Sequence, residues 1–218
     1  MIRRDLGGFI LKNIYQQQWQ LFKQSYWKTF VSLFLLFIIA AFVSYNYMLN
    51  NQALMNEFML QIMQMFEETE LLKPGTSSPE LALGLFINNT RASLLIALTG
   101  FIPIFLPALS ILFFNGAIMG VLFAFMSTRG VEVSIFSMLM TGIVPHGVFE
   151  IPAVVLSGAI AFYLSLGIFR KLNDRQYSFK TCVLNAGKTF LFVVVPLLII
   201  AAIVEAFITP LIMTSTVI

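Results

Sequence analysis

Long apolar runs separated by short polar segments predict five membrane-spanning helices. Residues 29–49 form a run of 21 without a charge. At about 1.5 Å rise per residue, a helix of this length crosses a hydrocarbon core of roughly 30 Å. Further spans are expected at 84–101, 104–126, 146–169 and 189–208. The pattern therefore predicts an all-α integral membrane protein with a single helical membrane domain over residues 29–210.

Two segments between these spans have a different pattern. Within 50–72, apolar residues recur every four positions, at Leu54, Phe58, Ile62 and Phe66, with polar and acidic residues between them. This predicts an external amphipathic helix that packs on its own bundle or on a partner. The apolar stretch of 134–145 reaches only about 17 Å as helix, which is too short to cross the core. We expect a re-entrant half-helix there, and irregular backbone at that depth is tolerated only beside protein or water.

Basic residues gather before the first span and after the fourth. The lead-in 1–28 carries Arg3, Arg4, Lys12, Lys23 and Lys28, and the stretch after residue 169 carries Arg170, Lys171, Arg175, Lys180 and Lys188. Lysine and arginine favour the cytoplasmic side of a membrane, so both segments are predicted to be cytoplasmic. An even number of membrane crossings must then separate the two cytoplasmic segments. Spans one to four provide these four crossings. The same parity places the tail 211–218 outside.

The amino-acid composition supports an integral membrane protein and excludes a soluble domain. With 59% hydrophobic and 11% charged residues and a mean hydropathy of +0.89, the chain lies far outside the range of soluble domains. The isoelectric point near 9.1 follows from membrane orientation, so a lipid bilayer rather than a nucleic acid is the expected partner. The single cysteine, Cys182, excludes an intrachain disulfide.

Four ionisable residues remain at membrane depth once the loop charges are set aside. They are Arg91, His146, Glu150 and Glu205, with Asn89 and Asn115 as uncharged neighbours. Their positions along the spans place them in the outer half of the membrane, where they can meet in one layer. His146 and Glu150 share a helix face because they are four residues apart. Arg91 is expected to pair with Glu150 or Glu205, since an unpaired charge there is penalised.

Three interpretations of this buried polar layer are open. It can be a polar core that fixes how the spans pack, or part of a proton or ion pathway. A metal-hydrolase interpretation needs three protein ligands; His146 and Glu150 supply two, and the spacing does not require Glu205 as the third. Nucleophile elbows and phosphate-binding glycine loops are missing from the sequence. The sequence therefore predicts no catalytic residue, no enzyme activity, no metal and no cofactor.

We assign a role in helix packing to the glycine and proline residues near this layer. Gly116 and Gly120 lie four residues apart in the third span, a spacing that lets another helix approach closely. Pro145, Gly147 and Pro152 surround the histidine and glutamate of the fourth span. We assign the same packing role to all five.

The string PHGVFEIPA at 145–153, with Asn115, Gly116 and Gly120 upstream and VEAFITP at 204–210, resembles the stage II sporulation protein M family of prokaryotic membrane proteins. The resemblance covers most of residues 30–210. It implies a mostly five-span protein of the cytoplasmic (inner) membrane of a prokaryote. It also marks His146, Glu150 and Glu205 as family-typical positions.

The resemblance also implies a function. In endospore formers, the founding member of the family is a membrane scaffold that holds peptidoglycan-degrading proteins during engulfment of the forespore. We therefore expect a scaffold or assembly component for envelope processes. It would act as a homo-oligomer, with a dimer favoured, or with an envelope protein partner. The alternative is a small oligomeric transporter or channel that uses the buried polar layer.

Overall fold

The computed structural model describes residues 3–68, 76–128, 141 and 144–216. Over these residues the chain is helical and contains no strand. Five helical stretches are long and apolar enough to cross a membrane: Leu11–Leu49, Ser78–Phe101, Leu106–Thr128, Val144–Asn173 and Phe179–Ile212. The prediction of an all-α protein with five spans is confirmed. Most of the predicted re-entrant segment, 134–145, lies outside the described residues, and Val144 and Pro145 at its end belong to the fourth span.

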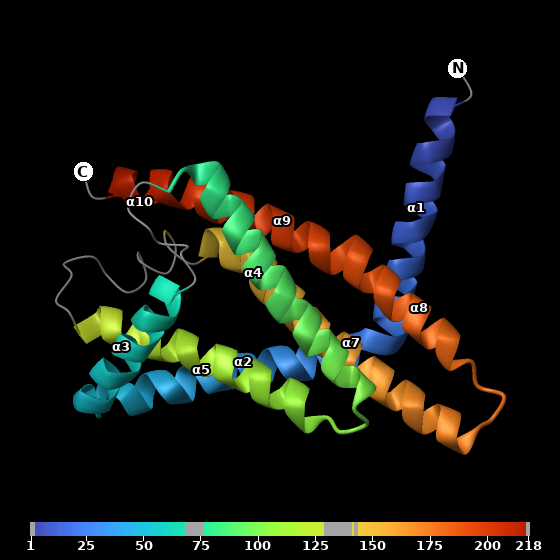
Figure 1. Cartoon of the computed structure of the whole chain (residues 1–218), viewed down its shortest axis with the longest axis horizontal. Coiled ribbons are helices and arrows are strands. Elements are labelled where there is room, and N and C mark those ends of the chain that lie inside the picture. Colours follow the sequence, from blue (N-terminus) through green and yellow to red (C-terminus); the bar gives the residue numbers. More distant parts are fainter. Residues whose placement is uncertain (1–2, 69–75, 129–140, 142–143, 217–218) are drawn as a thin grey trace.

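The first span is longer than the sequence pattern predicts, because the lead-in is also helical. Helix α1 (Arg3–Leu21) continues through a π-helical turn, Phe22–Tyr26, into α2 (Trp27–Leu49). Figure 1 shows that α1 points away from the other helices, at a steep angle to α2. The side chain of Tyr26, in the π-turn, is completely buried. The bend therefore lies at the point where the chain enters the bundle.

Helix α3 (Gln52–Glu68) follows α2 after a tight turn and packs back on the bundle. Its buried residues are Met55 and Met59, which join Met48 of α2 and Val121 and Ala124 of α5 (Leu106–Thr128) in one apolar cluster. Leu54 and Ile62 of the predicted stripe are half-buried against the same cluster, whereas Phe58 is exposed.

Helix α4 (Ser78–Leu98) begins six residues before the predicted start of the second span. The reason is a capping box in which the carboxylate of Glu80 accepts hydrogen bonds from the Ser77 backbone N–H at 3.0 Å and from its hydroxyl at 2.8 Å. Pro79 occupies the first turn, where its missing N–H has no helical partner to lose. The helix ends in a 3₁₀ turn, Thr99–Phe101, before α5 begins.

Helix α7 (Val144–Asn173) is the central element of the bundle. In its most apolar 18-residue window 61% of the residues are buried, against 17–33% in the other spans. The last span is one long helical run divided by two π-turns. It consists of α8 (Phe179–Thr189), the turn Phe190–Val194, α9 (Val195–Ile203), the turn Val204–Ile208 and α10 (Thr209–Thr216). The part of the predicted tail that the structure describes is therefore helical.

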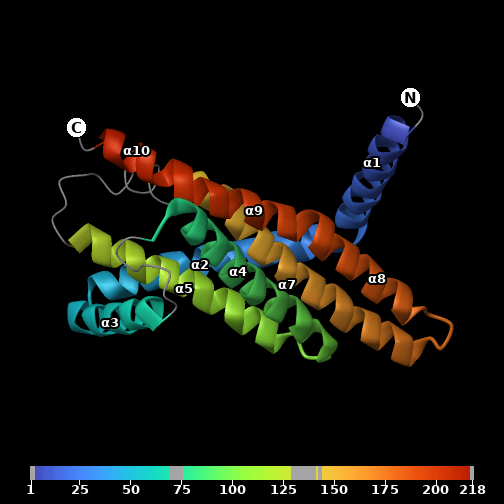
Figure 2. The same cartoon turned by 45° about the horizontal axis from the view of Figure 1, so that its top comes forward.

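The spans alternate in direction, as Figures 1 and 2 show. The α1–α2 bend, the 3₁₀ turn after α4 and the turn between α7 and α8 lie at one end of the bundle. Helix α3 and the C-terminus lie at the opposite end. This arrangement agrees with the parity expected from the basic residues. Helices α2 and α5 run side by side in the same direction.

Glycines allow two of the closest helix contacts. A Cβ atom on Gly116 would collide with the carbonyl oxygen of Phe37, and one on Gly120 with that of Ala41, both in α2. Gly100, in the 3₁₀ turn, meets the backbone of Ala161 in α7 in the same way. Small residues let helix backbones approach closely in membranes, where helix packing depends on van der Waals contact.

Candidate functional site

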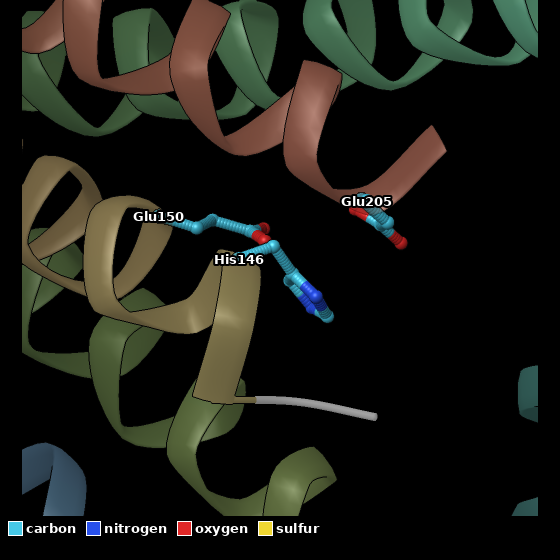
Figure 3. Close-up of side chains that lie close together, drawn as sticks. All are labelled: His146, Glu150 and Glu205. Carbon is cyan, nitrogen blue, oxygen red and sulfur yellow. The ribbon is translucent and has the colours of Figure 1, made fainter. Parts of the chain in front are cut away.

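Three ionisable side chains from two spans lie together near the end of the bundle that holds the C-terminus. His146 and Glu150 come from the first turns of α7, and Glu205 comes from the π-turn Val204–Ile208. Each offers one ligand atom, and the three atoms lie within 4.8 Å of one another. Figure 3 shows the two carboxylates and the imidazole facing a common space between the two helices. We call these three residues the His–Glu–Glu triad.

The α7 half of the triad follows directly from the local sequence. Pro145 lies in the first turn of α7, where a proline fits because the first backbone N–H groups of a helix have no helical partner. His146 and Glu150 then lie one turn apart on the same side of the helix. The prediction that they share a face agrees with the positions of their ligand atoms.

The position of Glu205 depends on the π-turn. Pro210 cannot donate the usual hydrogen bond to residue 206, and its ring crowds that carbonyl. The five-residue turn just before it widens the helix, and the Thr209 hydroxyl donates to the Val204 carbonyl at 3.2 Å. The other π-turn, Phe190–Val194, likewise stands just before a proline, Pro196. Such turns insert one residue and re-aim the side chains around them, and they are frequent at functional sites.

A small cavity of about 70 Å³ adjoins the α7 side of the triad. His146, Glu150 and Asn115 supply its polar lining, and the other lining residues are Phe37, Met119, Gly147, Ile151 and Val154. The amide nitrogen of Asn115 donates to the Ile111 carbonyl of its own helix at 2.8 Å. The amide oxygen of Asn115 can still accept a hydrogen bond, as can the carboxylate of Glu150.

The imidazole of His146 has a buried nitrogen without a partner. Its Nδ1 atom has no hydrogen-bond partner among the described residues. A buried polar atom in that state is unusual and calls for an explanation, such as a bound ion or water. Two carboxylates and an imidazole can share a proton or ligate a divalent metal ion.

Arg91 does not join the triad. It lies two residues before Ser93, which is completely buried in α4, and two residues correspond to about 200° around a helix. Arg91 is therefore on the exposed side of α4. Among the residues that the structure describes, it forms no ion pair with Glu150 or Glu205. Its long side chain can instead extend towards the membrane surface. Asn89 lies half-buried on the same helix, outside the triad.

A second polar cluster, at the other end of the bundle, was not predicted. The Thr189 hydroxyl donates to the Gln18 side-chain oxygen at 2.7 Å and lies 3.3 Å from the Tyr26 hydroxyl. All three residues are buried. Gln18 lies in a run of glutamines just before the first apolar stretch. The only sequence signal for this cluster is therefore a polar residue at the membrane edge. Its partner, Thr189, is 171 positions away in the sequence.

The comparison with protein families decides the classification of the chain. Residues 30–210 match the family model described as stage II sporulation protein M. The chain belongs to this family. The stage II sporulation protein M match includes the whole triad, with Pro145, Pro210 and Asn115, and it starts after Gln18 and Tyr26. The resemblance drawn from the sequence is thereby confirmed.

One relative of known sequence is similar to this family member over part of its length. It is the uncharacterized protein MJ0793 of Methanocaldococcus jannaschii, which is 30% identical over 131 residues. The matched region covers 59% of this chain and 71% of that protein. No solved structure matches the chain.

Proposed function

We propose that the protein is a non-enzymatic assembly component of a prokaryotic cytoplasmic membrane that docks an envelope protein through α3. The observation that carries this proposal is the two-sided character of α3. Its Met55 and Met59 are buried against α2 and α5, while Phe58, Leu60 and Met63 are 42%, 61% and 52% exposed. A helix outside the spans that is fixed on one side and exposes apolar side chains among polar ones on its remaining surface is suited to bind a partner.

The charge of α3 indicates the chemistry of that partner. The helix carries Glu57, Glu67 and Glu68 and no basic residue. Anionic lipid headgroups are repelled by such a surface. We infer a partner segment that presents apolar side chains flanked by lysine or arginine. Family membership supports the proposal, because it places the chain among proteins whose founding member is a scaffold.

Site-specific photo-crosslinking in native membranes tests this docking surface. A photoreactive amino acid at Leu60 or Met63 should capture one protein, and mass spectrometry should map the crosslink to a basic, apolar segment. The matched control is the same probe at Ile39, which is 57% exposed on α2 within a span and should capture no such protein. Glu57→Lys should abolish the capture at Leu60. If capture at Leu60 and Met63 fails, or is unchanged by Glu57→Lys, the proposal is wrong.

The alternative function is a small oligomeric transporter or channel, and the triad with its adjoining cavity favours it. Ionisable residues inside a membrane are typical of ion and proton pathways. Proteoliposomes with the purified protein should then conduct protons or ions, and Glu150→Gln should reduce the flux at least tenfold. Vesicles that stay tight under proton, cation and anion gradients would exclude this function.

A further inference from the structure

We propose that His146, Glu150 and Glu205 form a binding site for one divalent first-row metal ion, with Zn²⁺ the best fit. The inference goes beyond an assembly role and does not depend on it. The three ligand atoms lie within 4.8 Å of one another, although Glu205 lies more than fifty residues after Glu150 in the sequence. The spacing in the sequence does not require this convergence, and it arises only in the folded chain.

The distances suit a metal ion. Zinc bonds to nitrogen and oxygen of about 2.0–2.2 Å hold neighbouring ligand atoms roughly 3.4 Å apart in a tetrahedral site. The triad atoms must therefore approach one another by roughly 1.4 Å at most. Torsions of the two glutamate side chains can supply that movement without a change in the backbone.

The charges also favour a divalent ion. Two carboxylates at membrane depth are penalised unless a positive charge compensates them. Arg91, the cation that the sequence offered for this role, lies on the exposed side of α4. One ion of charge +2 balances both carboxylates. It would also engage a lone pair of the imidazole, whose buried Nδ1 has no partner in the described part of the chain.

The donor set narrows the choice of metal. An imidazole with two carboxylates is typical of zinc and its first-row neighbours, whereas thiolate-binding ions and calcium prefer other ligands. Three protein ligands leave a fourth position for water. The amide oxygen of Asn115, which lines the same cavity as His146 and Glu150, is free to accept a hydrogen bond from that water.

Metal content of the purified protein tests the site without any assay of activity. The protein should carry a tag without histidine, because His146 is its only histidine. After treatment with a chelator, loading with Zn²⁺ and removal of free metal, we expect one zinc per chain by mass spectrometry. Zinc should also raise the thermal unfolding midpoint, since an ion that binds only the folded state stabilises it by mass action.

Isosteric variants identify the ligands. Glu205→Gln and Glu150→Gln should each weaken zinc binding by at least about 100-fold, because even the loss of a ligand's hydrogen-bond partner lowers metal affinity roughly 10–100-fold. Glu57→Gln, at an exposed position of α3, should retain the zinc. Cys182→Ala should retain it too, which excludes binding by the thiol.

Two outcomes would overturn the proposal. One is a wild-type protein that holds no more zinc than Glu205→Gln after loading. The other is equal zinc content in all variants, which would mean adventitious binding elsewhere. Helical circular dichroism and a monodisperse elution profile confirm that each variant is folded. Glu150→Gln and Glu205→Gln test two different ligands, so each gives separate evidence for the zinc site.

Discussion

Thr189, in the last span, forms hydrogen bonds with the N-terminal lead-in. Its hydroxyl lies within 3.3 Å of oxygen atoms on both Gln18 and Tyr26, in surroundings where all three side chains are buried. A buried polar atom that loses its partner is costly, because no water replaces the lost bond. This small cluster therefore holds the bend between α1 and α2 against α8.

Replacement of Thr189 by valine should destabilise the fold. The change keeps the shape of the side chain and removes its hydroxyl, which leaves the Gln18 oxygen without that donor. We expect the free energy of unfolding to fall by about 0.5–2 kcal/mol, the range of hydrogen bonds between membrane helices. Reversible denaturation in mixed micelles measures the change. Thr189→Ser retains the hydroxyl and should lose less; equal losses in both variants would contradict the role of the hydrogen bond.

At the scale of whole elements, proline and glycine set the shape of the spans. Pro196 and Pro210 each follow a π-turn, because proline offers no N–H to the carbonyl four residues earlier. Gly116 and Gly120 bring α5 against the backbone of α2. Contacts this close leave no room for a methyl group.

The glycines of the chain provide a matched pair of substitutions. In Gly120→Ala the new Cβ meets the Ala41 carbonyl, whereas in Gly187→Ala nothing lies within 4 Å of it. We expect Gly120→Ala to lower the free energy of unfolding by about 1–3 kcal/mol through overpacking. Gly187→Ala should leave it unchanged or raise it by up to about 1 kcal/mol, since alanine favours helix. The same unfolding assay compares them. Similar losses would show that helix propensity, and not the α2–α5 contact, explains the effect.

At the scale of the whole molecule, the alternating spans divide the polar segments between two ends. Helix α3 lies at one end, and the turn between α7 and α8, which contains Asp174, lies at the other. The basic residues cluster at the second end, around Arg170 and Arg175. Because basic residues favour the cytoplasmic side, we propose that this end faces the cytoplasm.

Cysteine labelling in intact cells tests this orientation. In a Cys182→Ala background, Glu57→Cys and Asp174→Cys each place a thiol at an exposed position. A membrane-impermeant maleimide should modify residue 57 directly and residue 174 only after the membrane is permeabilised. The reverse pattern would invert the topology, and labelling of both residues in sealed cells would contradict the alternation of the spans.

Some features of the site could be predicted from local sequence and others could not. The placement of His146 and Glu150 on one helix face follows from helical spacing, so it could be predicted from the sequence. The expected pairing of Arg91 failed because it depends on the rotation of α4, which buries Ser93 and turns Arg91 outward. Rotation follows from packing against all neighbours at once, and depth along a span does not reveal it.

The sequence by itself determined the class of the protein, its five spans and its family, because the length of an apolar run and the presence of a motif are local properties of the chain. Only the tertiary structure decided that Glu205 meets His146 and Glu150, that α2 pairs with α5, and that Gln18 reaches Thr189. Each of these contacts joins residues far apart in sequence. Each depends on how the helices rotate, bend at their π-turns and approach one another, which is fixed by the packing of the whole bundle.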